Sequence, residues 1–400
     1  MKAGWQISTL GDVLDVLRNG VNCKQDKSGK GDKISRIESI SDASFDLGKV
    51  GYAELTERDK ERNRLQQGDI LFSHINSAIH VGKTAVFDSA VPVYHGVNLL
   101  LMRPKDVVTP AYLDHTLKYI FQSGYWRDVC KQSVNQASVN QQDISRVQIS
   151  YPKSLPEQQR IVGILDEAFE GIATAKANAE KNLQNAHSLF ESHLQSVFTK
   201  RGDGWVEKPL DALTEPDSPI TYGVVKPGDE GEIRFVRGGD LVRGKVRLTK
   251  LRTITRTVSD QYRRTLLKGG ELLICLVGQP GQVGVAPDDL AGANIARQVG
   301  LIRLKKNLNA EFVRYFFQSG PGAAALGARE SGSVQQVINL GELRQVLVPH
   351  PQLDEQNEVV ASLDLVEAET QRLESLYQRK LAALEALKKS LLHQAFTGGL

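Results

Sequence analysis

The sequence has few cysteines and no long apolar run, and each of these absences excludes a class of protein. Its three cysteines, Cys23, Cys130 and Cys275, form no CxxC pair, which argues against a disulfide framework and favours a reducing compartment. No stretch reaches the roughly 20 apolar residues that a membrane span needs, and the segment MKAGWQISTL lacks the apolar core of a signal peptide. We therefore expect a cytoplasmic protein that does not interact with membranes.

Motifs for bond-making chemistry are also missing. No Pro-Pro pair occurs, so the Asn/Asp-Pro-Pro-aromatic motif with which amino-methyltransferases hold a base is absent. The segment SAIHVGKT resembles a phosphate-binding loop, but Ser77 replaces its first glycine and a strand-like run follows, so we interpret Gly82 as structural. His74 and His80 have no partner at metal-ligand spacing. The sequence predicts a chain without a catalytic, cofactor or metal site of its own.

What the sequence does contain is a repeat, whose second copy begins about 200 residues after the first. Trp5 returns as Trp205, and Arg103 returns as Arg303. The segment LQSVFT at 194–199 returns as LHQAFT at 392–397. Two copies of one unit indicate one task that is carried out at two places.

Each copy is expected to be a mixed α and β domain followed by one long helix. Short β-rich runs separated by glycine and polar residues predict strands at 69–73, 84–87 and 98–102, and again at 271–275, 282–285 and 299–303. The predicted fold is α+β, with two tandem mixed α/β domains that two long helices separate and join. The expected boundaries are a first module at 1–153, a helix at 154–200, a second module at 201–352 and a helix at 353–400.

The two long helices carry apolar residues at alternating steps of four and three, which is typical of a coiled coil. The predicted seam runs from Ile161 to Leu189 and Val197 in the first helix, and from Val359 to Leu387 and Ala395 in the second. Small residues in one seam match larger ones in the other, so we expect the helices to pack as an antiparallel pair. At 1.5 Å per residue each helix would be about 60 Å long. Such a pair would act as a spacer longer than one turn of B-DNA, about 34 to 36 Å.

Charge separates the modules from the helices. Residues 205–350 carry 20 Lys and Arg against 15 Asp and Glu, whereas residues 351–400 carry 5 against 8. Between Arg243 and Arg264 lie eight basic residues and the single acid Asp260. Such a basic segment suits contact with phosphates, although solvated basic loops are also common. Architecture alone would equally fit a coiled-coil scaffold or interaction protein without nucleic-acid binding.

Several motifs are similar to those of one known family. PEQQRIVGILDEAF at 156–169 with its partner DEQNEVVASLDLVE, LQQGDILFS at 65–73, and the segment LKKSLLHQAFTGGL at 387–400 resemble the DNA specificity (S) subunit of type I restriction-modification systems. The resemblance covers the whole chain and is strongest in the helices. One departure is Asp354 in place of Pro156, and this acidic helix start is favoured by the helix dipole.

This resemblance implies a division of labour among subunits. Each module would read half of an asymmetric, bipartite site in double-stranded DNA, and the helices would set the spacing and dock methyltransferase (M) subunits. S-adenosylmethionine, ATP and Mg would bind to the partner M and restriction (R) subunits, with no cofactor in this non-catalytic chain. A scaffold protein, or an enzyme with an unrecognised site, are the alternatives.

Base reading requires Arg for guanine and Asn or Gln for adenine. The polar loops at 132–136 and 332–336 occupy corresponding places in the two copies, where they either approach DNA or only turn the chain back to the framework. The predicted DNA contacts in the first module are Arg36, His74, Asn76, Gln132, Asn135 and Gln136. Those in the second module are Arg237, Arg243, Lys245, Arg247, Lys250, Arg252, Arg256, Gln335 and Gln336.

Overall fold

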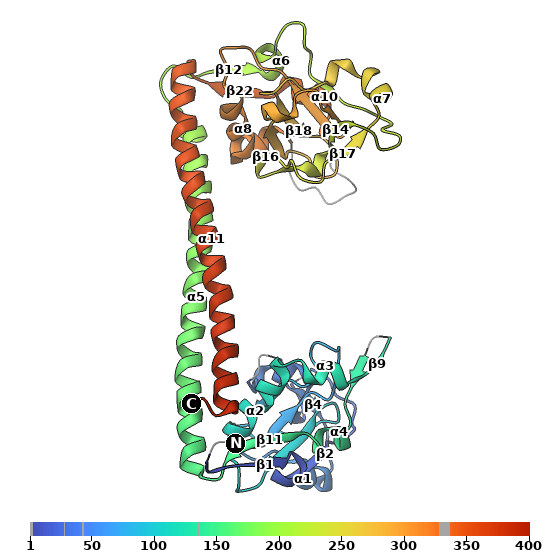
Figure 1. The fold of residues 1–400 in the computed structure, drawn as a ribbon, viewed down its shortest axis with the longest axis vertical. Coiled ribbons are helices and arrows are strands. Elements are labelled where there is room, and N and C mark those ends of the chain that lie inside the picture. The colour runs from blue at the N-terminus through green and yellow to red at the C-terminus, as the bar shows by residue number, and fades with distance from the viewer. Residues whose placement is uncertain (1–2, 28, 42–43, 135, 328–336) are drawn as a thin grey trace. The chain divides into compact units, whose positions relative to one another are not determined.

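A computed structural model of the chain describes residues 3–27, 29–41, 44–134, 136–327 and 337–400. The chain divides into two compact units (Figure 1). Unit 1 comprises Met1–Glu180 and Arg379–Leu400, and unit 2 comprises Lys181–Gln378. Each unit therefore holds one predicted module, with one stretch of α5 (Leu155–Lys200) and one stretch of α11 (Leu353–Thr397).

The centre of unit 1 is a four-stranded antiparallel sheet that is covered on both faces. The strands lie in the order β2 (Leu14–Asn19), β8 (Leu100–Pro104), β5 (Ile70–Phe72) and β7 (Thr84–Val86). Successive side chains of a strand point to opposite faces, so Ile70 and Phe72 enter one core and Leu71 enters another. Burial on both faces explains why these strands are continuous apolar runs rather than alternating ones.

Smaller elements surround this sheet. Helices α2 (Pro110–Gln122) and α3 (Tyr125–Val129) add Tyr112 and Trp126 to the core that holds Phe72. Gly82, at φ +94°, leaves no room for a Cβ, which would lie 2.1 Å from Trp126, so its predicted structural role is confirmed. The remaining elements are α1 (Glu57–Asn63), α4 (Gln141–Ser145), the pair β1 (Trp5–Thr9) and β11 (Gln148–Pro152), the pair β3 (Asp32–Ile34) and β4 (Gly51–Ala53), and the sheet β6 (Ile75–Asn76), β10 (Gln136–Ser138), β9 (Lys131–Ser133).

Unit 2 repeats this plan with a larger sheet. The six strands lie in the order β13 (Thr221–Tyr222), β21 (Val299–Ile302), β18 (Leu272–Cys275), β19 (Val283–Val285), β16 (Gly244–Val246), β15 (Leu241–Val242). A second sheet contains β17 (Arg252–Ile254), β14 (Ile233–Val236) and β20 (Asn294–Ile295), and β12 (Val206–Pro209) pairs with β22 (Leu347–His350). The helices are α6 (Leu210–Leu213), α7 (Arg256–Asp260), α8 (Ala310–Gln318), α9 (Gly320–Ala325) and α10 (Leu340–Gln345). These mixed units and long helices confirm the predicted fold class, and no described helix is long and apolar enough to cross a membrane.

A glutamine occurs at the same place near the start of each long helix, and it fixes that helix to its module. Gln158 is fully buried; its Oε1 accepts from the Thr109 backbone N–H at 2.8 Å, and its Nε2 donates to the carbonyls of Val107 and Pro152 at 3.0 and 2.8 Å. In unit 2 the equally buried Gln356 repeats this pattern with the backbone of Asn309, Asn307 and Pro351. A buried amide with all of these partners satisfies backbone groups that water cannot reach.

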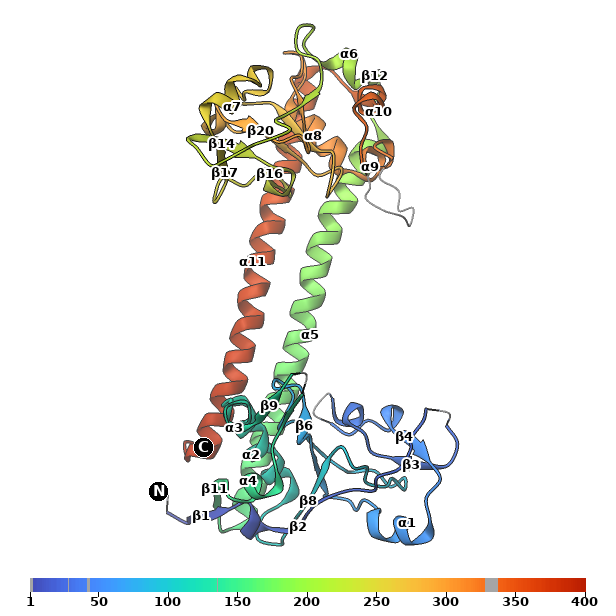
Figure 2. The ribbon, with the colours of Figure 1, turned by 90° about the vertical axis from the view of Figure 1, so that its right-hand side faces the viewer.

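Inside each unit the two helices run antiparallel, since the beginning of one lies with the end of the other. In unit 1, Ile161 and Leu165 of α5 share a core with Leu392 and Phe396 of α11, next to α2 (Figure 2). An ion pair of 2.8 Å joins Lys176 to Glu385 across the same two helices. In unit 2 the partners are exchanged, so that Leu194 and Phe198 of α5 share a core with Val360 and Leu363 of α11.

The predicted seam is wrong at one position toward the end of each helix, whereas Ala395 and Val197 further along pack against the cores as predicted. Leu189 and Leu387 are 64% and 48% exposed, although the periodicity places them in the helix interface. The last turns instead bury Phe198 against Phe312 in unit 2 and Phe396 against Tyr112 in unit 1, with ring centroids 5.3 Å apart in both. The buried face therefore follows the aromatic surface of the module rather than the seam.

Candidate nucleic-acid interface

The predicted basic segment from Arg243 to Arg264, hereafter the basic strip, lies mostly on the surface of unit 2. Arg243 stands in the turn between β15 and β16 with φ +49°, a left-handed conformation that the following Gly244 continues at φ +78°. This turn points Arg243 and Lys245 outward while Leu241 and Val246 are buried. Lys250, also left-handed at φ +57°, is exposed in the turn before β17.

Arg237 and Arg247 are held by a buried carboxylate. Asp240 is fully buried and accepts from Arg237 Nε at 3.2 Å, from Arg247 Nη2 at 2.9 Å and from the Arg237 backbone N–H at 2.9 Å. Burial by itself raises the pKa of Asp240, but the Arg237 backbone N–H and the two guanidinium groups outweigh burial and lower that pKa. The two arginines are still about half exposed, so they stabilise the loop and also present charge.

Unit 1 builds the same turn with different charges. Arg36 occupies the position of Arg237, before a short 3-10 helix, and Ser39 occupies that of Asp240. The Arg36 backbone N–H donates to Ser39 Oγ at 3.1 Å, and the guanidinium pairs with Glu38 at 3.1 Å. Both predicted arginines therefore lie at equivalent places in the two units, which the sequence reasoning did not recognise.

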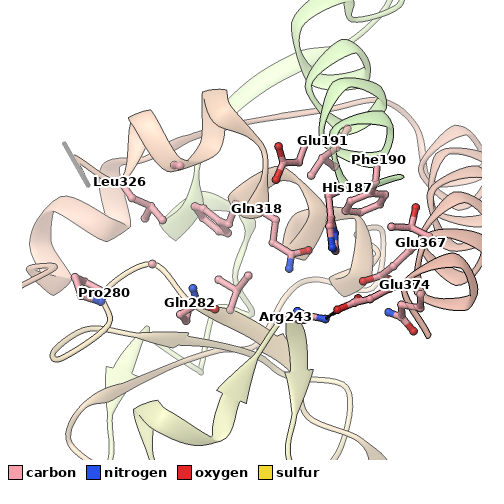
Figure 3. A pocket seen from close by; sticks show the side chains of 17 residues that line it. His187, Phe190, Glu191, Arg243, Pro280, Gln282, Gln318, Leu326, Glu367 and Glu374 are labelled. Carbon is pink, nitrogen blue, oxygen red and sulfur yellow. Dashed lines mark hydrogen bonds and ion pairs between the residues drawn. The ribbon is translucent and has the colours of Figure 1, made fainter. Parts of the chain in front are cut away.

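Other predicted cations differ in how far they are already paired. Arg243 forms a 2.9 Å ion pair with Glu374 of α11 (Figure 3). Arg252 donates to the Gly228 carbonyl at 2.8 Å, and Arg256 lies 3.4 Å from Glu232. Among the described residues, Lys245 and Lys250 have no ion-pair partner. Among the predicted DNA contacts of unit 2 that the structure describes, these two lysines would therefore give up the fewest existing interactions on contacting a phosphate.

The Arg243–Glu374 pair closes one side of a cavity of about 580 Å³ inside unit 2. Glu191 and Phe190 of α5, Gln318 of α8 and Glu367 of α11 also line it (Figure 3). Its wall holds the three carboxylates of Glu191, Glu367 and Glu374 against the single guanidinium of Arg243, so this cavity does not suit a DNA phosphate.

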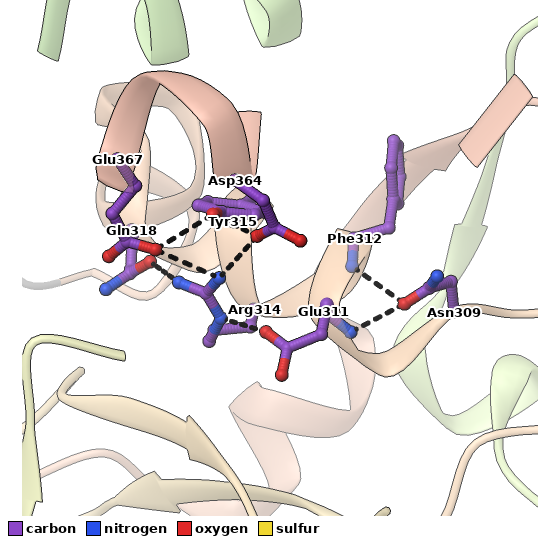
Figure 4. A network of polar contacts seen from close by, with 8 residues as sticks. All are labelled: Asn309, Glu311, Phe312, Arg314, Tyr315, Gln318, Asp364 and Glu367. Atoms are coloured by element: carbon purple, nitrogen blue, oxygen red, sulfur yellow. Dashed lines mark hydrogen bonds and ion pairs between the residues drawn. The ribbon is translucent and has the colours of Figure 1, made fainter. Parts of the chain in front are cut away.

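Beside this cavity a buried polar network joins α8 to α11 (Figure 4). Arg314 is only 3% exposed, pairs with Glu311 and lies 3.8 Å from Glu367. The Tyr315 hydroxyl donates to Asp364 at 2.7 Å, and burial followed by this hydrogen bond raises the tyrosine pKa. In unit 1 the equivalent contact is His115 Nε2 to Asp166 at 2.8 Å. Both networks attach a module to a helix, and the most exposed groups in them are the carboxylates of Asp166 and Asp364, which do not suit contact with a DNA phosphate.

In unit 1 the structure brings several predicted residues onto one small sheet. The segment predicted as a polar loop is instead the hairpin β9–β10, which pairs with β6. Ala137 of β10 pairs with Asn76 of β6 on one side and with Gln132 of β9 on the other. Gln136 is the first residue of β10 and pairs with Ser133. Gln132 and Gln136 are exposed, as is Val134 at 96%. Three residues of the prediction, Asn135, Gln335 and Gln336, lie outside the described residues.

His74 differs from the other predicted contacts because it is buried. It is 6% exposed, and burial lowers its pKa to about 4. Its Nε2 lies 3.1 Å from the amide of Asn19, which in turn accepts from Gln141. Sequence reasoning missed Asn19 and Gln141, although the run Asn140-Gln141-Gln142 was a visible amide-rich signal.

No group of three or more His, Cys, Asp or Glu side chains with metal-binding geometry occurs within the described ranges. The three cysteines are free. The polar surfaces described above offer amides, the imidazole of His74 and cations.

The chain is similar to several known proteins. Residues 2–184 match the family described as the type I restriction modification DNA specificity domain. The chain is 29% identical to the putative type I restriction enzyme MjaX specificity subunit of Methanocaldococcus jannaschii, over 98% of this chain and 93% of that protein. It is 30% identical to the EcoBI specificity subunit of Escherichia coli, over 62% of this chain and 57% of that protein.

Two solved structures share the fold. A chain from the structural work on complex assembly and conformational transition of the type I R-M system aligns with a TM-score of 0.74 at 17% identity, covering 100% of this chain and 99% of that one. The HsdS subunit from Thermoanaerobacter tengcongensis aligns at 0.61 and 17% identity, covering 100% and 98%.

The sequence and the fold of unit 1 are thus those of a DNA specificity domain. The same framework occurs again in unit 2, and the likeness to specificity subunits runs along nearly the whole chain. Residues 2–184 belong to the type I restriction modification DNA specificity domain family, and nearly the whole chain is similar to specificity subunits of type I restriction-modification systems, which favours the family that the motifs predicted over a scaffold protein.

Proposed function

We propose that the two units read the two different parts of one asymmetric, bipartite site in double-stranded DNA. One observation carries this proposal: the two units share a framework but present different chemistry on it. At the turn that both units share, Arg36 pairs with Glu38 in unit 1, whereas Asp240 binds both Arg237 and Arg247 in unit 2. Elsewhere unit 1 presents amides on β6, β9, β10 and α4, and unit 2 presents cations around β15 and β16. Different reading surfaces on a repeated framework would recognise different bases.

The long helices would set the distance between the half-sites and dock methyltransferase subunits. Their acidic exposed faces and antiparallel pairing within each unit support this role. Methylation with S-adenosylmethionine would belong to methyltransferase subunits, and cleavage driven by ATP and Mg to restriction subunits. This chain would recognise the DNA sequence, and the complex would act in the cytoplasm. The similarity to type I specificity subunits supports that division.

Alanine substitution of the two unpaired lysines tests the DNA-binding surface of unit 2. Each of Lys245→Ala and Lys250→Ala should reduce the slope of log K against log salt by about 0.9, because each would remove one phosphate contact. The measurement is the affinity of the full chain, assembled with its methyltransferase subunits, for duplex DNA at several salt concentrations.

Lys208→Ala, an exposed lysine on β12, is the matched control and should leave the slope unchanged. Unchanged slopes for both Lys245→Ala and Lys250→Ala would remove the β15–β16 surface from the interface. Equal affinity of the wild-type complex for all duplex sequences would contradict the proposed function itself.

A further inference from the structure

A polar groove of about 600 Å³ opens in unit 1 where the end of β2, the strand β6 and the start of α4 meet. Its lining contains one cation, Lys131, and no carboxylate. Amides dominate the rest of it. The lining includes the side chains of Asn19, His74, Gln141 and Gln142.

The orientation of the Asn19 amide is fixed by a backbone carbonyl. Asn19 Nδ2 donates to the Val97 carbonyl oxygen at 3.2 Å, and a carbonyl can only accept. This contact settles which end of the amide is nitrogen, an assignment that otherwise rests on the surrounding hydrogen bonds. Asn19 Oδ1 consequently faces Gln141 and accepts from Gln141 Nε2 at 2.8 Å.

His74 completes the arrangement as an acceptor. Its Nε2 lies 3.1 Å from Asn19 Nδ2, so it receives the second Asn19 N–H and the ring proton sits on Nδ1. Burial lowers the pKa of His74 to about 4, so the ring is neutral near pH 7 and keeps this lone pair. Both donors of Asn19 are therefore used on two rigid partners.

Gln141 is left with one free donor and one free acceptor. Its backbone is fixed at the start of α4, where Asn140 Oδ1 accepts from the Asp143 N–H at 2.7 Å. One N–H of its Nε2 goes to Asn19, while the other N–H and Oε1 have no partner within the described residues. The side chain is exposed, so both groups are available to a ligand.

One donor beside one acceptor on a planar amide matches the major-groove edge of adenine. Adenine N7 accepts and its N6 amino group donates, which is why Gln and Asn are its usual partners. A side chain already held in place loses less entropy on binding than a free one. Gln142 also lines the groove, but no described side chain holds its amide.

We propose that Gln141 reads an adenine in the half-site of unit 1, contacting its N6 and N7, and that Asn19 and His74 are positioning residues for Gln141. This inference rests on the proposed function, because it assigns a base contact to a surface that is proposed to meet DNA.

The test uses the full chain assembled with its methyltransferase subunits and the duplex sequence that this complex methylates. Gln141→Leu should lower affinity for that duplex by roughly ten- to a hundred-fold, the usual value of one bidentate base contact. It should leave binding to random duplex DNA, and base preference in the other half-site, unchanged. Replacing the contacted adenine by 7-deazaadenine, which lacks the N7 acceptor, should weaken the wild type but add little to Gln141→Leu.

Gln142→Leu is the matched control and should retain the wild-type response to 7-deazaadenine. Asn19→Ser should reduce discrimination at the same base position without changing affinity for random DNA, which a merely structural defect would not do. If the wild type discriminates sequences while 7-deazaadenine has equal effects on wild type and Gln141→Leu at every adenine, the inference fails and the proposed function stands. If the wild-type complex discriminates no sequence, the proposed function fails first.

Discussion

The two units share one framework but differ in how their interiors respond to protons. In unit 1 three histidines occupy framework positions, His74, His95 and His115, and each is less than 10% exposed. The backbone contacts of His74 and His95 are repeated in unit 2 by Leu276 and Ile295, and the helix contact of His115 by Tyr315. The repeat therefore preserves backbone geometry and helix attachment, while the side chains that fill the positions are free to change chemistry.

Acidification gives the largest expected difference between the units. Burial lowers the pKa of His74 to about 4, that of His95 to about 3, and that of His115 as well, from an ordinary 6.5. Folding therefore favours the neutral rings, so their contribution to stability is complete above about pH 7 and is lost as pH falls below 6.5. At pH 5 the first two would each cost unit 1 about 2 kcal/mol, at 1.36 kcal/mol per pKa unit.

Hydrogen exchange resolved by unit, at pH 7.5 and pH 5 and corrected for intrinsic rates, measures this difference. Unit 1 should lose more protection than unit 2. His95→Gln should flatten the pH dependence of unit 1, whereas His393→Gln, at an exposed histidine of the same unit, should leave it unchanged. Equal losses in both units would break the comparison.

The turns that carry Arg36 and Arg237 give the next largest effect. Asp240→Ala removes charged hydrogen bonds to two half-exposed arginines and a backbone cap, so we expect a loss of about 2 to 3 kcal/mol in the free energy of unfolding of unit 2. Asp240→Ser copies Ser39 of unit 1 and keeps the cap, so it should cost about 1 kcal/mol less.

Denaturant unfolding followed in unit 2 measures both changes. Asp260→Ala, which removes an exposed carboxylate 3.9 Å from Arg263, should change stability by less than about 0.5 kcal/mol. Equal losses for the two Asp240 variants would show that the shared cap contributes nothing.

The buried glutamines should give a smaller effect, and the same one in both units. Gln158→Ala in unit 1 and Gln356→Ala in unit 2 each leave a backbone N–H and two carbonyls without partners, at a cost of about 2 kcal/mol. Thermal or denaturant unfolding of the full chain, read out separately in each unit, measures the two losses. Gln159→Ala, at an exposed neighbouring residue, is the control. Losses of unfolding free energy that differ between the units by more than about 1 kcal/mol would show that the two glutamines do not stabilise their units equally.

The sequence predicted the parts of the fold that follow from periodicity and repetition. The strands at β5, β8 and β18, the two long helices and the duplication all leave a local or a self-similar pattern. The exposure of Leu189 and Leu387 could not be predicted in this way, because the buried face of a helix end depends on the aromatic residues of a distant segment.

The candidate site was harder to predict than the fold. Charge pointed to the strip that includes Lys245 and Lys250, but it could not show that Arg243 is paired with Glu374. The link from His74 through Asn19 to Gln141 joins residues that are 55 and 122 positions apart, and no local spacing reveals such a chain of hydrogen bonds.

The sharing of Leu392, Ala395 and Phe396 with the core of unit 1 has a consequence for biosynthesis. A ribosome makes the strands of unit 1 early and these three side chains very late. Until they emerge, Tyr112 and its neighbours face water, and the growing polypeptide carries an uncovered apolar surface of the kind that chaperones bind. In unit 2 the two helix segments immediately precede and follow the module, so its core can be completed first. We therefore expect unit 2 to finish folding before unit 1, although unit 1 is translated first.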